Sequence, residues 1–397
     1  MIQLSKRLVS VLLPGLISVL CAAQDAPHYK VDPSWPKPLP NQWMLGHVET
    51  VVVDKDDHIW VAHYTGPLDR RMDHLDMGLA QNPPLSECCI PAPAVMEFDP
   101  EGNVLRAWGG PGYIPEWPEA IHAMWVDGKG NVWIGGNHAP DRNVLKFSPD
   151  GKLLLEIGRL DGPVGIYVAN RPELAEPNNQ VTDLLGGPSG IAVDDEANEV
   201  YIADGYVNKR VMVFDSNTGK FKRGWGAYGI PLTAIDNKKL PQNDPAAHNS
   251  TTLSNYDPKA PPDKQFRGPV ESIQISKDGL VYVGDRNSRR IQVFTKAGKY
   301  IDEFFVARET LLQDGTTHGM TFSRDPEQKY LIVADGADNT VWFLNRKDGS
   351  VAGHFGHTSR GAGQFDVLNW VATDSHGNLY TTEVKYNDRM QKFDLEK

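Results

Sequence analysis

Basic charge, cysteine and long apolar runs are all scarce in this chain. Of its 397 residues, 40 are Lys or Arg and 51 are Asp or Glu, which gives a net charge of −11. Nucleic acid and anionic membranes both attract a basic surface, so neither is expected as a partner. Only three cysteines are present, too few for a cysteine-based metal cluster. The chain also has no P-loop, no Rossmann glycine pattern, no EF-hand loop and no Gly-x-Ser-x-Gly elbow.

The longest apolar stretch lies at the N-terminus and has the pattern of a secretory signal. Lys6 and Arg7 precede the apolar residues 8–20, and small residues follow up to Ala23. This stretch is shorter than the ~20 residues that span a bilayer. We therefore predict a signal peptide over 1–23, cleavage after Ala23, no membrane insertion after cleavage, and a secreted or periplasmic protein.

Two adjacent cysteines, Cys88 and Cys89, lie in the remaining chain. An oxidising compartment allows them to form a disulfide between neighbours, and two free thiols are the alternative. The sequence leaves this choice open.

One pattern recurs six times along the chain and predicts its fold. Each copy has an apolar-x-apolar segment, a short turn, and a second apolar segment that usually contains an aromatic residue. A third segment, a hairpin turn and a fourth segment follow. The first two segments of the six copies lie at residues 51–63, 124–136, 191–204, 273–285, 320–335 and 371–383.

Four short strands per copy predict an all-β fold, a six-bladed β-propeller, as one domain over 24–397. The sixth copy ends before its fourth strand, so we expect residues 28–37 to supply that strand and close the ring. Long surface loops are expected at 64–92 and 230–266, where the repeat is interrupted by polar residues and proline. A monomer is expected.

Two of the copies resemble NHL repeats. In IADGYVNKRVMVF (202–214) and VGDRNSRRIQVF (283–294), an Asp ends the second strand and a loop with Asn and Arg follows. The pattern predicts ion pairs of Asp204 with Arg210 and of Asp285 with Arg290, which would fix the loop that leads into the third strand.

Among NHL propellers, the chain is most similar to the peptidylamidoglycolate lyase family, which releases a peptide amide and glyoxylate from a peptidyl-α-hydroxyglycine. The resemblance implies zinc in the central channel, held by three His residues near the starts of alternate inner strands. It also implies a Tyr base in an Asp-Gly-Tyr loop and arginines that hold the substrate carboxylate. The positions that match are His122, Tyr206 and Arg286.

Three other family positions differ in this chain. Glu271 and Asn369 occupy the places of the other two His ligands, and Tyr64 occupies the place of a second family Arg. The His triad that the resemblance implies is therefore incomplete, which weakens the case for the hydroxyglycine reaction itself.

The residues alone indicate a polar ring in the channel. Alignment of the six copies places one residue per blade two positions before the apolar-x-apolar pair, where the inner strand should face the axis. The six are Glu49, His122, Ser189, Glu271, His318 and Asn369. His nitrogens and carboxylate oxygens together suit zinc or another transition metal, and calcium is the second choice. We predict that His122, Glu271, His318 and Glu49 hold a divalent metal.

The same ring has a simpler interpretation, in which polar side chains in a solvated channel bond only to one another and to water. Three functions therefore stay open: a metal-dependent enzyme of the amidating-lyase type on a small-molecule or peptide substrate with a carboxylate, a metal-dependent lactone or ester hydrolase, and a non-catalytic binding propeller. In the first, Arg286 would hold the carboxylate and Tyr206 would act as a general base or hydrogen-bond donor. Of the other His residues, His63 is the strongest further candidate, because other blades carry Asp or Glu at its position.

Overall fold

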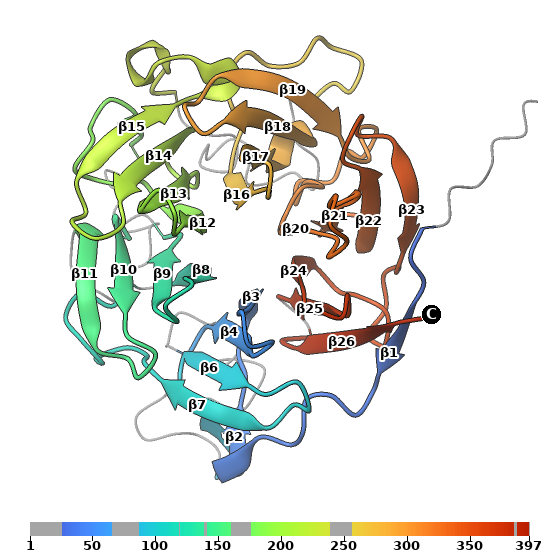
Figure 1. The fold of residues 1–397 in the computed structure, drawn as a ribbon. Coiled ribbons are helices and arrows are strands. Elements are labelled where there is room, and N and C mark those ends of the chain that lie inside the picture. The colour runs from blue at the N-terminus through green and yellow to red at the C-terminus, as the bar shows by residue number, and fades with distance from the viewer. Residues whose placement is uncertain are drawn as a thin grey trace, which may run out of the picture.

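The protein is a closed ring of six β-sheet blades around a central axis (Figure 1). A computed structural model describes residues 26–65, 87–118, 120–138, 141–159, 176–238, 256–384 and 387–396. Within these ranges the strands form six four-stranded sheets and one two-stranded sheet. The prediction of an all-β six-bladed propeller is confirmed.

Each blade is an antiparallel meander whose first strand lies nearest the axis. Blade one contains β3 (Val48–Val53), β4 (Ile59–His63), β6 (Val95–Phe98) and β7 (Val104–Trp108). Blade two contains β8 (Ile121–Val126), β9 (Val132–Gly136), β10 (Asn143–Phe147) and β11 (Leu153–Gly158). Blade three contains β12 (Pro188–Asp194), β13 (Glu199–Asp204), β14 (Arg210–Asp215) and β15 (Phe221–Trp225).

The second half of the ring repeats this order. Blade four contains β16 (Val270–Ile275), β17 (Leu280–Asp285), β18 (Arg290–Thr295) and β19 (Tyr300–Phe305). Blade five contains β20 (Met320–Phe322), β21 (Tyr330–Asp335), β22 (Thr340–Asn345) and β23 (Val351–Phe355). Blade six contains β24 (Leu368–Thr373), β25 (Leu379–Glu383) and β26 (Met390–Leu395) from the C-terminal end of the chain.

The N-terminal strand β1 (Tyr29–Asp32) completes blade six. It pairs antiparallel with β26, with Tyr29 opposite Leu395 and Asp32 opposite Lys392. Figure 1 shows the blue strand β1 beside the red strand β26 at the rim of the ring. This joins the two ends of the described chain in one sheet and confirms that residues within 28–37 supply the missing strand.

The core consists of apolar layers between neighbouring blades. The aromatic residue of the second strand is fully buried in five blades, as Trp60, Trp133, Tyr201, Tyr282 and Tyr380. Several of these rings also satisfy their polar atom with the acidic residue of the preceding turn: Trp60 Nε1 donates to Asp54 at 2.9 Å and Trp133 Nε1 to Asp127 at 3.2 Å. The alternating pattern read from the sequence thus places one large buried ring in five of the six blades.

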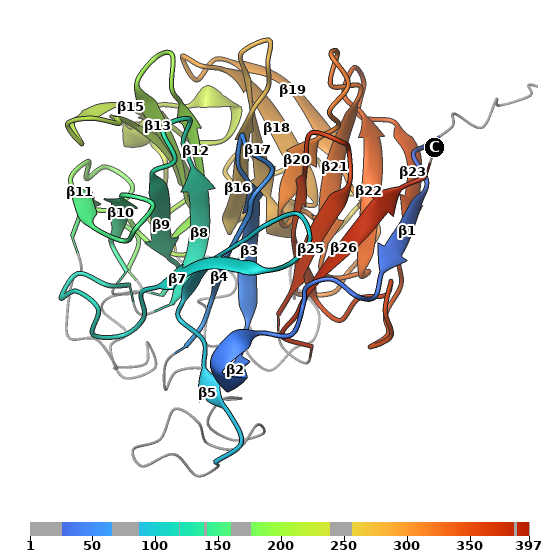
Figure 2. The ribbon, with the colours of Figure 1, turned by 60° about the horizontal axis from the view of Figure 1, so that its bottom comes forward.

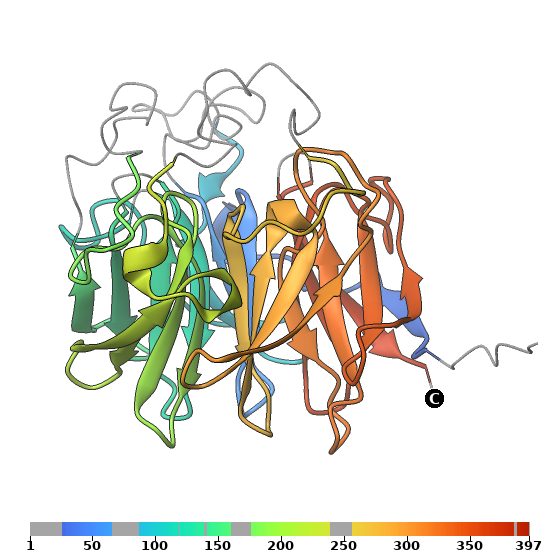
Figure 3. The ribbon, with the colours of Figure 1, turned by 90° about the horizontal axis from the view of Figure 1, so that it is seen from above.

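A small two-stranded sheet projects from one face of the ring (Figure 2). β2 (Trp43–Met44) pairs parallel with β5 (Ile90–Pro91) just after Cys88 and Cys89, which form a disulfide. Seen from the side, the blade strands run between the two faces of the ring (Figure 3). In the described ranges, no helix is long and apolar enough to cross a membrane.

Several predicted segments lie outside the described residues. These are the signal peptide at 1–23, most of the loop at 64–92 and the middle of the loop at 230–266. Short 3₁₀ turns are described just before the second loop, at Ala227–Gly229, and within it, at Leu232–Ala234.

Candidate functional site

The predicted ring positions coincide with a repeated β-bulge. In five blades the register between the first and second strands skips one residue of the first strand. The skipped residues are Glu49, His122, Ser189, Glu271 and Asn369. A bulge leaves its extra residue outside the ladder and turns its side chain away from the regular alternation. The sixth position, His318, lies just before β20.

His122 lies at the centre of the contacts among these residues. Its Nε2 is 3.2 Å from Glu271 Oε1 and 3.7 Å from Glu49 Oε2. Its Nδ1 is 3.0 Å from the Ser189 carbonyl oxygen, which can only accept, so Nδ1 carries a proton. In the neutral ring, a lone pair on Nε2 would therefore face two carboxylates. Burial opposes a charge on His122, but Glu271 and Glu49 outweigh it and raise the pKa of His122.

Glu271 and Arg286 form a buried ion pair at the same place. Arg286 Nη1 is 3.2 Å from Glu271 Oε1, and Glu271 is fully buried. Burial favours the neutral carboxyl, yet Arg286 and His122 lower the pKa of Glu271 to about 2. Glu271 Oε2 and Arg286 Nε are both buried without a hydrogen-bond partner. The cluster therefore keeps one unsatisfied acceptor and one unsatisfied donor, which a ligand could use.

Tyr206 joins this cluster from the loop after β13. Its hydroxyl lies 3.2 Å from His122 Nε2 and 3.4 Å from Glu271 Oε1, and it accepts a hydrogen bond of 3.0 Å from Arg286 Nη1. Burial raises the pKa of Tyr206, and the charge of Arg286 opposes that rise. Gly205 allows this approach, because a Cβ there would overlap the backbone of Val270 in the next blade.

One residue that the sequence did not single out, Asn137, contacts Tyr206. Asn137, just after β9, forms a side-chain hydrogen bond with Tyr206. Asn137 Oδ1 also accepts a hydrogen bond of 3.2 Å from the Tyr64 hydroxyl. Tyr64, at the position where the resemblance implies an Arg, stacks on His47 with ring centroids 5.5 Å apart. At this position the chain thus has an aromatic contact between Tyr64 and His47, where the resemblance implies a second guanidinium.

The predicted metal ligands meet only in part. Glu49, His122 and Glu271 approach one another around His122 Nε2, and Asn369 holds Glu49 through hydrogen bonds to its carbonyl oxygen at 2.6 Å and its Oε2 at 3.1 Å. The charge of His318 contributes to the lowered pKa of Glu271, and its Nδ1 accepts a hydrogen bond of 3.2 Å from Gly336 N.

These residues suit a cation chemically, because imidazole and carboxylate are zinc ligands and Glu271 Oε2 is unsatisfied. Their ligand atoms are nevertheless farther apart than in a compact metal site. In the described part of the chain, three His or acidic residues with ligand atoms within 4.8 Å of one another occur at Asp54, His58 and Glu97, outside the channel.

His63 has a structural role at the end of β4. Its ring is 99% buried, its Nδ1 accepts a hydrogen bond of 3.1 Å from Gly46 N, and its Nε2 lies 2.9 Å from the Pro93 carbonyl oxygen. Asp285 has the equivalent position in blade four. It binds the loop before β16 by accepting hydrogen bonds from the backbone N–H groups of Arg267 and Gly268. His63 therefore fixes a loop and does not reach the channel cluster through these contacts.

The predicted ion pairs of the NHL-like loops are confirmed. Arg210 Nε lies 2.7 Å from Asp204 Oδ2, and Arg290 Nη2 lies 3.0 Å from Asp285 Oδ2, with all four side chains fully buried. Each guanidinium also donates to loop carbonyl groups, for example Arg210 to Asn179 and Leu184. These loops carry Tyr206 and Arg286, so the pairs hold the two predicted catalytic side chains in place.

Comparison with known sequences supports the resemblance. The NHL repeat family matches residues 185–214. The chain is 23% identical over 344 residues to peptidyl-glycine alpha-amidating monooxygenase B of Xenopus laevis, covering 85% of this chain and 32% of that protein. It is 21% identical to a probable peptidyl-alpha-hydroxyglycine alpha-amidating lyase of Caenorhabditis elegans, covering 75% of this chain and 69% of that protein. The chain thus carries an NHL repeat and is distantly similar to amidating enzymes, and it spans about a third of the length of the Xenopus relative.

Solved structures with a similar arrangement include a virginiamycin B lyase from Staphylococcus aureus. That structure has a TM-score of 0.47 and 12% identity, and the match covers 92% of this chain and 88% of that one.

Proposed function

We propose that this protein is a secreted enzyme of the amidating-lyase type, which cleaves an α-hydroxyglycine or a related α-hydroxy carboxylate at the mouth of the channel. The observation that carries the proposal is the position of the Tyr206 hydroxyl, which lies within hydrogen-bond reach of Arg286, His122 and Glu271. A hydroxyl surrounded by a cation, an imidazole and a carboxylate can exchange protons with a substrate hydroxyl.

The chain's own residues suggest a proton relay. In the lyase reaction the substrate hydroxyl loses its proton, its oxygen forms the aldehyde C=O, the Cα–N bond breaks, and the amide nitrogen gains a proton. Because the pKa of Tyr206 is raised, the phenol enters the reaction protonated. As it takes the substrate proton, it can pass its own to His122 Nε2 or to Glu271 Oε1. Tyr206 would then act as a relay and need not be a phenolate.

Arg286 is proposed to hold the substrate carboxylate. Its guanidinium is balanced by Glu271 in the ion pair, but Nε has no hydrogen-bond partner and is available to an acceptor. A substrate carboxylate there would compete with Glu271 for the same cation. A ligand that withdraws Glu271 from the pair would therefore strengthen substrate binding.

A divalent cation, with zinc favoured, is proposed for the same cluster. His122, Glu271 and Glu49 would hold it, with His318 as the fourth predicted ligand. When bound, such an ion would polarise the substrate oxygen and lower the pKa of the hydroxyl. It would also satisfy Glu271 Oε2, a buried acceptor that has no hydrogen-bond partner among the described residues.

The test of the proposed function combines turnover with metal content. Full-length mature protein is incubated with a peptidyl-α-hydroxyglycine, and glyoxylate release is measured for the wild type, Tyr206→Phe and the matched control Tyr300→Phe on the outer strand β19. We expect release by the wild type and the control, and a loss of at least a hundredfold for Tyr206→Phe. Equal rates for all three proteins would remove Tyr206 from the reaction.

Metal content tests the cofactor separately. We expect about one transition metal per chain in the wild type and in His58→Gln, and loss of that metal in His122→Gln. Loss in His58→Gln instead would place the ion at the Asp54, His58 and Glu97 set. A metal-free wild type with no glyoxylate release would identify a binding propeller, and hydrolysis of lactones or esters by the metal-loaded protein would identify the hydrolase.

A further inference from the structure

The Tyr206 hydroxyl has a donor on one side and two acceptors on the other. Arg286 Nη1 donates to its oxygen at 3.0 Å. His122 Nε2, in the neutral ring, and Glu271 Oε1 lie 3.2 and 3.4 Å from the oxygen and can each accept its proton. A phenol has a single proton to donate, so its direction depends on every group that contacts the oxygen. Asn137 is a further contact of this kind.

The side-chain amide of Asn137 has a defined direction. Its Oδ1 accepts a hydrogen bond of 3.2 Å from the Tyr64 hydroxyl, which leaves the N–H donors of the amide for other groups. Burial raises the pKa of Tyr206, and the hydrogen bond with Asn137 opposes that rise. A bond donated to the phenol oxygen has this effect because it stabilises the phenolate, whereas a bond accepted from the phenol would have the opposite effect. Asn137 is therefore a donor to Tyr206, and Tyr64 orients it.

The backbone brings Asn137 and Tyr206 together at Gly187. The N–H of Asn137, after β9, donates to the Ala120 carbonyl oxygen at 3.0 Å, and the N–H of Tyr206, after β13, donates to the Gly187 carbonyl oxygen at 3.0 Å. Gly187 has a φ of +72°, and a Cβ on it would lie 2.8 Å from Tyr206 Cβ and 2.9 Å from the Asn137 carbonyl oxygen. A glycine is therefore needed for the two loops to approach this closely.

The Tyr64 ring is held in place by two imidazole rings. It stacks on His47 with ring centroids 5.5 Å apart, and His138 lies at its edge with ring centroids 6.4 Å apart. The backbone N–H of Tyr64 also donates to the His47 carbonyl oxygen at 3.0 Å. A ring packed on two sides holds its hydroxyl in one direction, here toward Asn137. Tyr64, Asn137 and Tyr206 thus form a chain of hydrogen-bonding side chains across blades one, two and three.

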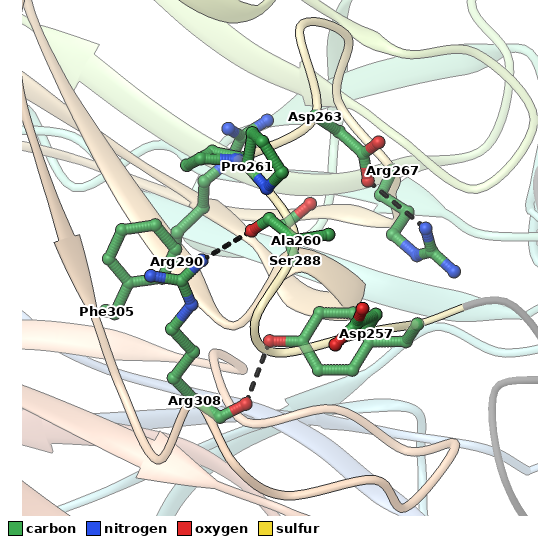
Figure 4. Close-up of a pocket in the computed structure, with 11 residues that line it drawn as sticks. Asp257, Ala260, Pro261, Asp263, Arg267, Ser288, Arg290, Phe305 and Arg308 are labelled. Atoms are coloured by element: carbon green, nitrogen blue, oxygen red, sulfur yellow. Dashed lines mark hydrogen bonds and ion pairs between the residues drawn. The ribbon is translucent and has the colours of Figure 1, made fainter.

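Arg286, the other donor to Tyr206, lies in the 3₁₀ turn η7 (Arg286–Ser288). The outer side of this turn borders a small pocket, in which Figure 4 shows Arg267 paired with Asp263 at 3.1 Å. Carboxylates and guanidinium groups both line that pocket, so it places no unbalanced charge behind Arg286. The contacts of Arg286 on the channel side therefore decide its effect on Tyr206.

We propose that Asn137 and Tyr64 are positioning residues for Tyr206. They turn its hydroxyl proton toward the acceptors His122 and Glu271. Because Asn137 and a guanidinium group both donate to the phenol oxygen, the phenol proton is left for the acceptors on the other side. This is the direction that the proton relay of the lyase reaction needs. The effect on turnover rests on the proposed function, whereas the direction of the proton rests on the contacts of the hydroxyl alone.

Glyoxylate release from a peptidyl-α-hydroxyglycine, measured as kcat and KM of the mature protein, tests the effect on turnover. Asn137→Leu keeps the size of the side chain but removes its donor, so kcat should fall about tenfold while KM changes by less than about twofold. Tyr64→Phe should lower kcat severalfold in the wild type but cause no further loss in Asn137→Leu, because Tyr64 acts through Asn137. The matched controls are Tyr300→Phe and Asn217→Leu, the latter on an exposed hairpin, and both should keep the wild-type values. Circular dichroism verifies that each variant is folded.

Neutron diffraction from crystals of the wild type exchanged into heavy water measures the direction of the proton without any substrate. We expect the Tyr206 hydroxyl deuterium on the side of His122 and Glu271, and an amide deuterium of Asn137 facing the Tyr206 oxygen. A Tyr206 deuterium that faces Asn137 would overturn the proposal.

The kinetic outcomes are equally decisive. An unchanged kcat in a folded Asn137→Leu, or independent losses from Tyr64→Phe and Asn137→Leu that multiply in the double variant, would overturn the proposal. A wild type that releases no glyoxylate would instead refute the proposed function, and the neutron result would then decide the role of Asn137 by itself.

Discussion

Blade five carries a buried carboxyl without an arginine, and this predicts how stability changes with pH. Asp335 is fully buried, and its register partner on β22 is Thr340, whereas the equivalent Asp204 and Asp285 face Arg210 and Arg290. Asp335 Oδ2 accepts a hydrogen bond of 3.0 Å from the Trp342 indole instead. Burial raises the pKa of Asp335 from 3.8 to about 7, although hydrogen bonds from Asp338 N and Trp342 lower it in part.

The sign of the effect follows from proton uptake. Between about pH 4 and pH 7, Asp335 is protonated in the folded protein and ionised in the unfolded chain. The native state then binds one more proton, so the free energy of unfolding falls as pH rises, by about 1.4 kcal/mol per pH unit. The stabilisation is fully present below pH 3.8 and is lost as pH rises through about 7. The whole change is on the order of 4 kcal/mol.

Urea unfolding, followed by tryptophan fluorescence at pH 5 to 8, measures this change in the wild type and Asp335→Asn. The Asn variant cannot ionise, and its altered contact with Trp342 adds only a constant offset. The difference in unfolding free energy between the two proteins should fall by about 2 kcal/mol from pH 5 to 7 and level off near pH 8. Asp348→Asn is the control, because hydrogen bonds from Ser350 lower the pKa of that exposed Asp, so it titrates below this range. A difference that is constant, or that rises with pH, would refute the reasoning.

Three further predictions follow from the same structure. Arg210→Met leaves Asp204 buried without its cation, so the unfolding free energy should drop by about 3–5 kcal/mol in urea titrations, and a drop below 1 kcal/mol would contradict the role of the pair. Gly205→Ala places a Cβ against Val270, so it should destabilise the fold by about 1–3 kcal/mol and reduce turnover as Tyr206 moves; unchanged stability and rate would oppose this. Glu271→Gln removes the charge that raises the pKa of His122, so an NMR titration should show that pKa lower in the variant, and an equal or higher value would contradict the assignment.

Much of the fold could be predicted because it repeats. The same order of turn, apolar strand and aromatic residue recurs along the chain. A strand that is weakly marked in one copy can therefore be assigned by comparison with the other copies. The missing fourth strand of blade six was predictable for the same reason, and Tyr29–Asp32 fills it. The bulge residues were also predictable, since Glu49 and His122 stand at a fixed offset from the apolar pair in each copy.

Other features depend on contacts between a strand end and a later loop, or between neighbouring blades. The repeated sequence pattern does not reveal such contacts. Blade two has Gly136 where blades three to six have an acid, and Asp141 from the following loop accepts a hydrogen bond of 3.1 Å from Ala120 N in its place. A Cβ on Gly136 would clash with that carboxylate. The Asp141 carboxylate can therefore occupy this place only because residue 136 is a glycine. Asn137 was missed for a similar reason, because its role depends on a contact with Tyr206 from the next blade.

At position 271, where the resemblance to amidating lyases implies a His, this chain has Glu, and the difference bears on the proposed site. The bulge directs whichever side chain stands there toward Tyr206 and Arg286. A neutral imidazole would leave Arg286 with its full charge for a substrate carboxylate, whereas Glu271 neutralises it at every pH above about 2. Carboxylate binding should therefore be weak until a cation or a proton at the cluster competes for Glu271. If the proposed cation and a carboxylate substrate both bind at this cluster, their affinities should be positively coupled, since each ligand relieves a constraint on the other.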